Sequence, residues 1–213
     1  MESSVIDKIK PRMQHIWRKR RLSAFIKLMC IKSGYNIIDL GGTPELWEMI
    51  DLDLDITLLN LPEVQNQWQG PFKRTYRFVD GDACDAMDFA DNKFDVVFSN
   101  AVIEHVGPPD RQDAFAMTVR RLAHSYWVQT PSLWFPIESH CNLPFWWFYP
   151  QQIKQAWIRR WQQQGRELLW KQMAETRVLK LSRLKSLFPE AEVYTEYVAG
   201  FPKSYSIYKS ASK

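Results

Sequence analysis

The chain has 213 residues, which is enough for one domain of ordinary size with a continuous hydrophobic core. Its formal net charge of +4 comes from 28 basic and 24 acidic residues and does not indicate a nucleic-acid-binding protein. No apolar run approaches the roughly 18 residues that span a bilayer, and the three cysteines (Cys30, Cys84 and Cys141) form no CxxC pair. We therefore expect a cytoplasmic protein without a disulfide framework or a metal site.

The first 34 residues are predicted to form N-terminal helices. Apolar residues recur there at helical spacing, with basic residues between them, at Val5, Ile6, Ile9, Met13, Ile16 and Trp17. Pro11 is expected to kink this segment or to divide it into two helices. The basic run Arg18–Arg21 predicts a solvated face, and contact with an anionic membrane or polymer is the alternative.

Five short apolar segments then alternate with helices or short crossovers. They span residues 35–40, 56–59, 74–79, 94–99 and 125–129. Helices are expected to begin at Thr43-Pro44-Glu45 and after Pro108-Pro109, because proline is favoured at the first helical position. Strands joined by such crossovers predict a parallel sheet with right-handed connections.

The chain closes with two further strand candidates, residues 191–198 and 204–208. Gly200-Phe201-Pro202 joins them at hairpin spacing, so the last strand is expected to run antiparallel. The fold predicted from this order is α/β, with a doubly wound, mostly parallel sheet of seven strands.

Polar and glycine-rich segments follow four of the predicted strands. They are Asp39-Leu40-Gly41-Gly42-Thr43, then Asn60 with Leu61, then Asp82-Ala83, and then Ser99-Asn100 with Glu104-His105. In an open parallel sheet, ligands bind beyond the carboxyl ends of the strands. Glycine at such an end lets the backbone approach a ligand closely. The four segments therefore predict one ligand site at this edge of the sheet.

The sequence from Phe94 to Val106 reads Phe-Asp-Val-Val-Phe-Ser-Asn-Ala-Val-Ile-Glu-His-Val. It resembles the fourth-strand motif of the Rossmann-like (class I) S-adenosylmethionine-dependent methyltransferases, and residues 35–140 are similar to that family in the order of their elements. The resemblance implies that S-adenosylmethionine is the cofactor. It places the methionine part at Asp39, Gly41 and Gly42, the ribose at Asn60 and Leu61, the adenine at Asp82 and Ala83, and Asn100 beneath the reacting sulfonium.

Three positions depart from the family pattern. The acidic-x-Gly-x-Gly-x-Gly loop has Thr43 and Glu45 in place of its second and third glycines, and Asn60 replaces the carboxylate that usually holds the ribose. These departures leave open a non-catalytic relative that binds the cofactor or a partner. A nicotinamide dinucleotide is disfavoured, because its G-x-G-x-x-G fingerprint would need glycine where Thr43 and Leu46 stand.

With this resemblance, residues 1–213 are expected to form a single methyltransferase domain. Residues 1–34 would be its N-terminal helices and residues 35–130 its cofactor-binding core. Residues 131–190 would be an aromatic loop and helical cap between the fifth and sixth strands, and residues 191–213 the closing hairpin.

The segment Thr130–His140 resembles a Thr-Pro…Phe-Pro-Ile-Glu-x-His sequence of some bacterial relatives in the same family. Glu138 and His140 share one face of an extended chain. A histidine oriented by a carboxylate is suited to act as a general base. We therefore interpret His140, with Glu138 or His105, as the group that deprotonates or positions the acceptor. The alternative is that the pair only holds the loop in place.

The predicted cap is rich in aromatic and basic residues. Phe145-Trp146-Trp147-Phe148-Tyr149 precedes a helix that carries Trp157, Arg159, Arg160 and Trp161. An aromatic core beneath a helical cap, an acceptor pocket and a lipid-facing surface with peripheral membrane contact are all compatible with this pattern. We expect a small-molecule acceptor or a glycan or lipid biosynthetic intermediate. Nucleic acid is not expected, because Ser99–Val102 lacks the prolines and stacking aromatic of adenine methyltransferases.

Overall fold

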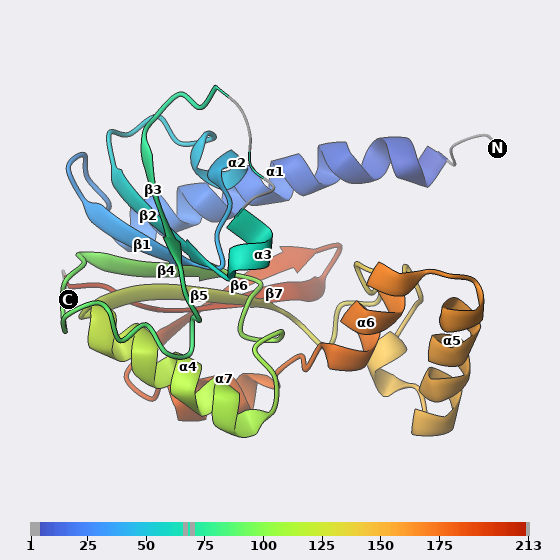
Figure 1. The fold of residues 1–213 in the computed structure, drawn as a ribbon. Helices are drawn as coiled ribbons and strands as arrows, with labels where there is room; N and C mark the ends of the chain where they lie inside the picture. The colour runs from blue at the N-terminus through green and yellow to red at the C-terminus, as the bar shows by residue number, and fades with distance from the viewer. Residues whose placement is uncertain (1–4, 66–67, 69–70, 212–213) are drawn as a thin grey trace.

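The computed structural model describes residues 5–65, 68 and 71–211, and its centre is one sheet of seven strands (Figure 1). The strands are β1 (Asn36–Leu40), β2 (Asp55–Asn60), β3 (Tyr76–Asp80), β4 (Val96–Asn100), β5 (Ser125–Pro131), β6 (Glu192–Val198) and β7 (Phe201–Lys209). Their spatial order is β3-β2-β1-β4-β5-β7-β6. Strands β1 to β5 pair in parallel, whereas β7 is antiparallel to both β5 and β6. The predicted fold class is confirmed.

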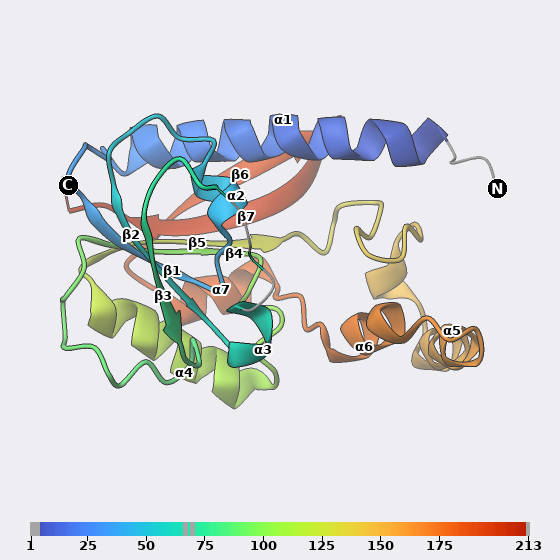
Figure 2. The same cartoon turned by 45° about the horizontal axis from the view of Figure 1, so that its top comes forward.

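Helices cover both faces of this sheet. They are α1 (Val5–Leu28), α2 (Pro44–Trp47), α3 (Pro62–Gln65), α4 (Pro109–Leu122), α5 (Gln151–Gln163), α6 (Glu167–Glu175) and α7 (Leu181–Leu187), with a 3-10 turn at Trp146–Phe148. Helix α1 lies on one face, and α4 and α7 lie on the other (Figures 1 and 2). Helices α5 and α6 stand beyond the end of the sheet as the predicted cap. Within the described residues, no helix combines the length and apolar character needed to cross a membrane.

The central strands bury both of their faces, which explains why they read as continuous apolar runs rather than as alternating ones. Successive residues point to opposite faces. Ile38, Val97 and Val128 pack with the α4 and α7 side of the core. Ile37, Val96 and Trp127 pack with the α1 and α2 side.

The structure excludes one of the two alternatives predicted for the N-terminal segment, a division into two helices. Instead of two helical pieces separated at Pro11, the structure has one helix, α1, which passes through this proline. Proline removes a single hydrogen bond from the helical ladder, and Pro11 lies near the beginning of a long helix. Leu22 and Phe25, farther along α1, are buried against the sheet. Packing of the second half of α1 against the sheet therefore determines the direction of the helix.

The closing hairpin is tighter than the sequence suggested. Strand β7 begins at Phe201 instead of Ser204, and the turn consists of Ala199 and Gly200 alone. Both turn residues have positive φ, 49° and 81° respectively. Two positive φ angles in a two-residue turn match the right-handed twist of hairpin strands. The longer β7 brings Lys203 into the sheet.

Candidate active site

The turn after β1 has no space for side chains. Gly41 has φ +77°, and a Cβ there would lie 2.6 Å from Cγ2 of Val102. A Cβ on Gly42 would lie 1.8 Å from Oδ2 of Asp39. The Gly41 N–H donates to the Leu59 carbonyl at 2.8 Å, which joins the turn to β2. Both positions therefore require glycine in this conformation.

Asp39 supports the turn from within the core. It is fully buried, and its Oδ2 accepts a hydrogen bond of 2.8 Å from Nε1 of Trp47. Its Oδ1 has no hydrogen-bond partner among the described residues. Burial raises the pKa of Asp39 to about 7, although the bond from Trp47 lowers it. At neutral pH this carboxyl can hold a proton, which reduces the cost of burying it.

Asn60 connects the ends of β1, β2 and β3. Its side-chain Nδ2 donates to the Gly42 carbonyl at 2.9 Å, and its own carbonyl accepts from the Gly81 N–H at 2.8 Å. Asn60 is 5% exposed, whereas the next residue, Leu61, is 52% exposed. The amide therefore braces the glycine turn, and Leu61 presents an apolar surface beside it.

Asp82 follows β3 and is held by a residue from a distant helix. One carboxylate oxygen accepts from the Cys84 N–H at 2.8 Å, and the other lies 2.6 Å from Nη2 of Arg111 in α4. Burial raises the pKa of Asp82, but the bonds from Cys84 and Arg111 outweigh it and leave the pKa below its usual value. Asp82 is therefore charged at neutral pH, with half-buried Ala83 beside it. Arg111 was not identified from the sequence.

Asn100, at the end of β4, contacts a buried arginine from α1. Its Oδ1 accepts a 2.6 Å hydrogen bond from Arg21, which also donates to Oε1 of Gln129 at 3.3 Å and forms a 2.8 Å ion pair with Glu196. Arg21 is 7% exposed. The predicted solvated face holds for Arg18, Lys19 and Arg20, which are exposed, but is wrong for Arg21. Arg21 lies one helical turn from buried Phe25, so both face the sheet.

The three residues predicted as catalytic lie together. Nδ1 of His140 is 2.7 Å from Oε1 of Glu138, and the backbone N–H groups of His140 and Cys141 donate to Oε2 of Glu138 at 2.6 and 2.8 Å. The ring centroids of His105 and His140 are 5.8 Å apart, with the rings perpendicular. Burial lowers the pKa of His105, and the neighbouring His140 lowers it further.

Hydrogen bonds stabilise the ionised form of Glu138. Burial raises the pKa of this carboxyl, but the bonds from His140 and the Cys141 N–H leave it below its usual value. The carboxylate therefore orients the imidazole ring of His140 at neutral pH.

Hydrogen bonds join the loop after β4 to the end of the cap. Buried Glu104 accepts from Oγ1 of Thr130 at 2.9 Å, and its backbone carbonyl accepts from the Arg177 N–H at 2.6 Å. Nδ1 of His105 lies 3.3 Å from Oγ1 of Thr176. Burial raises the pKa of Glu104 to about 7. These contacts place the histidine pair between the sheet and the segment that follows α6.

A cavity of about 380 Å³ adjoins this cluster. It is lined by α1, the end of β5, the aromatic loop and β7, through Met13, Gln14, Trp17, Gln129, Pro131, Ser132, Phe135, Ile137, Glu138, Ser139, Asn142, Trp147, Lys203 and Ser204. Gln129 is the register partner of Asn100 in the β4–β5 pair. Figures 1 and 2 show that α1 extends past the sheet on the side of the cap. The cavity therefore lies next to the position predicted beneath the sulfonium.

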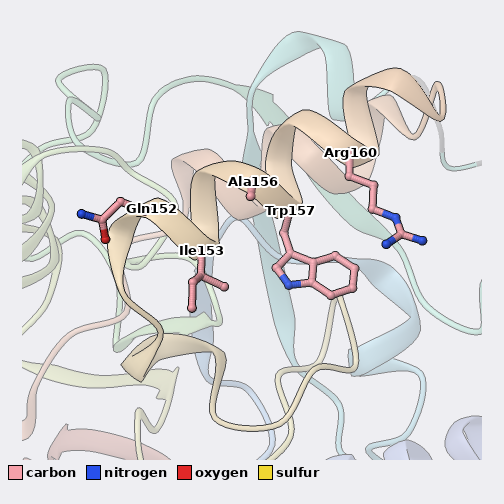
Figure 3. A pocket seen from close by; sticks show the side chains of 5 residues that line it. All are labelled: Gln152, Ile153, Ala156, Trp157 and Arg160. Atoms are coloured by element: carbon pink, nitrogen blue, oxygen red, sulfur yellow. The ribbon is translucent and has the colours of Figure 1, made fainter.

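The cap has a small core of its own. Trp146, Trp161 and Met173 form a buried cluster separate from the two faces of the sheet. On the outside of α5, an open pocket is lined by Gln152, Ile153, Ala156, Trp157 and Arg160 (Figure 3). The guanidinium of Arg160 lies 5.4 Å from the ring centroid of Trp157.

Comparisons with known proteins agree with this fold. Residues 33–125, from just before β1 to the first residue of β5, match the family model of the methyltransferase domain. No curated protein matches the sequence significantly.

Several solved structures share the fold at low sequence identity. A candidate sarcosine dimethylglycine methyltransferase from Galdieria sulphuraria is 12% identical and superposes over 92% of this chain and 86% of that protein, with a TM-score of 0.60. A protein from Pyrococcus horikoshii OT3 is 14% identical over 92% of this chain and 89% of that one, with a TM-score of 0.56.

Phosphoethanolamine N-methyltransferase 2 of Haemonchus contortus, solved with S-adenosyl-L-methionine, is also similar. It is 14% identical over 83% of this chain and 38% of its own length, with a TM-score of 0.55. The family match and the seven-stranded order show that the chain contains a class I, Rossmann-like, S-adenosylmethionine-dependent methyltransferase domain.

Proposed function

We propose that the chain is a methyltransferase that acts on a small molecule or on a glycan or lipid intermediate bound in the cavity beside β5. The observation that carries this proposal is the position of the cavity. It is lined by Gln129, the neighbour of Asn100, and by Glu138, the partner of His140. Donor-side and acceptor-side residues thus meet at one edge of the sheet, as proximity-driven transfer requires.

The donor side would hold S-adenosylmethionine through the ends of β1, β2 and β3. The bare backbone of Gly41 and Gly42 suits the methionine part, Asn60 and Leu61 the ribose, and Asp82 and Ala83 the adenine. S-adenosylmethionine, when bound, supplies an activated methyl group. The fit rests on two features of the structure, a turn that a Cβ would fill and an exposed Leu61 next to it.

On the acceptor side, His140 is suited to remove a proton from a hydroxyl or amine. Glu138 binds Nδ1 of His140 at 2.7 Å, so Nε2 is the basic nitrogen when Nδ1 carries the proton. His105 stands edge-on to the same ring, and its lowered pKa keeps it neutral near pH 7. A neutral neighbour adds no charge that would oppose protonation of His140.

Calorimetry with S-adenosylmethionine and S-adenosylhomocysteine tests the donor site directly. Micromolar affinity for both would support the proposal, and transfer of a labelled methyl group to fractionated small molecules of a cell extract would then identify the acceptor. Absence of cofactor binding by the folded protein would contradict it and favour a non-catalytic relative of the fold.

The α5 surface supports a peripheral membrane contact as part of this proposal. Ile153 and Trp157 line the open pocket of Figure 3 beside the cationic Arg160, and Phe148 is 51% exposed nearby in the chain. Aromatic and apolar groups flanked by arginine suit an anionic interface. Ile153→Glu should reduce sedimentation with phosphatidylglycerol vesicles, whereas Met117→Glu, on the exposed side of α4, should not. Equal sedimentation of wild type and Ile153→Glu would contradict this contact.

We also propose a cytoplasmic location. All three cysteines, Cys30, Cys84 and Cys141, are free thiols. Free thiols suit a reducing compartment. Localisation of a fluorescently tagged chain would test this expectation, and an extracytoplasmic signal would contradict it.

A further inference from the structure

Lys203 is a half-buried cation at the wall of the acceptor cavity. It lines the cavity from β7, and its Nζ lies 4.5 Å from the ring centroid of Trp17 in α1. Its side chain is 18% exposed. The backbone carbonyl of Lys203 accepts a 3.0 Å hydrogen bond from the Ser132 N–H, which fixes this part of β7 against the end of β5. The sheet therefore fixes the backbone from which the Lys203 side chain reaches the cavity wall.

Positive charge exceeds negative charge around Lys203. Its ion-pair partner Glu196 is 3.9 Å away, yet the same oxygen of Glu196 lies 2.8 Å from Arg21 and accepts from Oγ of Ser204. The pKa of Lys203 is lowered to about 8, because burial and the charges of Arg21 and Arg18 lower it by more than Glu196 raises it. One carboxylate is thus shared by two cations.

The other carboxylate at the cavity does not compensate Lys203. Glu138 already accepts from His140 and from two backbone N–H groups. An anionic group on a bound molecule would supply the missing charge, and a partly buried ammonium pairs with such a group more strongly than an exposed one does.

The remaining walls of the cavity are largely apolar. Met13 and Trp17 come from α1, and Phe135, Ile137 and Trp147 come from the aromatic loop. Its volume of about 380 Å³ lies in the lower part of the range for small-ligand pockets, roughly 300–1,000 Å³. This size suits one small molecule with an apolar body.

We propose that the methyl acceptor is a small amphipathic anion whose carboxylate, phosphate or sulfonate is bound by Lys203 and whose apolar part packs against Trp17 and Phe135. This inference rests on the proposed function, because it takes the cavity as the acceptor site. Lys203 is then a specificity-determining residue, contributed by β7 outside the stretch that matches the family model.

Two fluorescent probes of similar shape test the anion site in the full chain. Anilinonaphthalene sulfonate carries an anionic group, whereas phenylnaphthylamine is neutral. Lys203→Met should weaken sulfonate binding by about tenfold or more, as expected for loss of a partly buried charge pair. Lys203→Met should change the binding of the neutral probe little. Lys203→Arg should retain the binding of both probes. Lys185→Met, at an exposed position of α7, is the matched loss of charge and should change binding of neither probe.

Phe135→Ala tests whether both probes bind in this cavity. Because Phe135 lines the cavity, the variant should weaken the binding of both probes. The affinity for the sulfonate should also fall by about tenfold from pH 7 to pH 9 as Lys203 loses its proton, and Lys203→Arg should abolish this fall. The other charged groups that face Lys203 are Arg18 and Arg21 on α1, Glu196 on β6 and Glu138 in the loop. The lowered pKa values of Glu196 and Glu138 keep both carboxylates ionised from pH 7 to pH 9.

Two results separate this inference from the proposed function. Equal sulfonate affinity of wild type and Lys203→Met, with S-adenosylhomocysteine binding intact, would overturn the anion site and leave the methyltransferase proposal in place. Lysine-dependent sulfonate binding in a chain that binds no S-adenosylhomocysteine would support the anion site and overturn the proposed function.

Discussion

The carboxyl edge of the sheet has two halves that are built differently. At β1, β2 and β3, short links between neighbouring strand ends hold Gly42, Asn60 and Gly81 together. At β4, β5 and β6, a single side chain from α1, Arg21, joins residues that are 79, 108 and 175 positions away in sequence. The first half lies inside the stretch that matches the family model, and much of the second lies outside it. Local links therefore shape the proposed donor side, and long-range contacts shape the proposed acceptor side.

The largest effect is expected at the acceptor side. His140→Ala should reduce turnover about 10²- to 10⁴-fold, the usual contribution of a general base, and should leave cofactor affinity unchanged. Single-turnover transfer of labelled methyl to the identified acceptor fraction measures the first quantity, and calorimetry measures the second. Unchanged turnover in a folded His140→Ala protein would remove this residue from the mechanism and leave it a role in holding the loop.

Removal of Arg21 tests whether the acceptor side depends on one residue. Arg21→Met would remove the closer of the two cations beside buried Glu196 and leave Lys203, 3.9 Å away. Loss of one partner of a buried ion pair costs up to about 3–5 kcal/mol of unfolding free energy. Adding Glu196→Gln to this variant should restore part of the loss. Arg20→Met, an exposed change one residue away, should stay within about 0.5 kcal/mol of wild type in urea unfolding. Similar unfolding of the two single variants would contradict the linking role of Arg21.

The donor side is tested by filling its turn. Gly42→Ala places a Cβ against the Asp39 carboxylate, so the turn must shift. We expect cofactor affinity to fall by about a hundredfold, which corresponds to roughly 2.7 kcal/mol. Gly165→Ala, in an open turn of the cap, is the control and should retain cofactor affinity. Wild-type affinity in Gly42→Ala would show that the cofactor does not contact this turn.

Much of the fold, and the glycine turn of the proposed donor side, could be predicted from the sequence because the information is local. Strands that are buried on both faces appear as apolar runs, and the glycine turn follows the first run directly. Apart from β7, the observed strand bounds lie within two residues of the predicted ones. The group Glu138, His140 and His105 was also predicted, and their contacts support the interpretation without testing their roles.

The rest depends on which distant residues meet. Helical spacing places Arg21 one turn before Phe25, but it also places the exposed Arg18 one turn before buried Leu22, so the local pattern does not single out Arg21. Its burial follows from how α1 lies on the sheet. Arg111 pairs with Asp82 only because α4 packs beside the end of β3. Lys203 reaches the cavity only because the tight turn at Ala199-Gly200 lengthens β7. Tertiary contacts of this kind have no local pattern.

The pH dependence of the unfolding free energy tests whether buried Glu104 holds a proton in the folded protein. In the folded protein the pKa of Glu104 is about 7, above its value in the unfolded chain. As the pH rises from about 5 to 8, the unfolded chain therefore loses this proton before the folded protein does, and the unfolding free energy falls. Glu104→Gln should lack this part of the decline. Urea unfolding of both proteins at several pH values gives the difference. The variant and wild type would have parallel profiles if Glu104 were ionised throughout this range.

The smallest expected effect concerns the hairpin that carries Lys203. Ala199 has φ 49°, in the left-handed region that alanine tolerates poorly and asparagine tolerates better. Ala199→Asn should therefore stabilise the protein by about 0.5–1 kcal/mol, as Asn-Gly is a preferred two-residue hairpin turn. Thermal unfolding measures this gain, and Ala174→Asn in α6 should show none. Because β7 forms one wall of the cavity and none of the glycine turn, the stabilised hairpin should leave cofactor affinity unchanged. A change in that affinity would mean that the two halves of the edge are coupled.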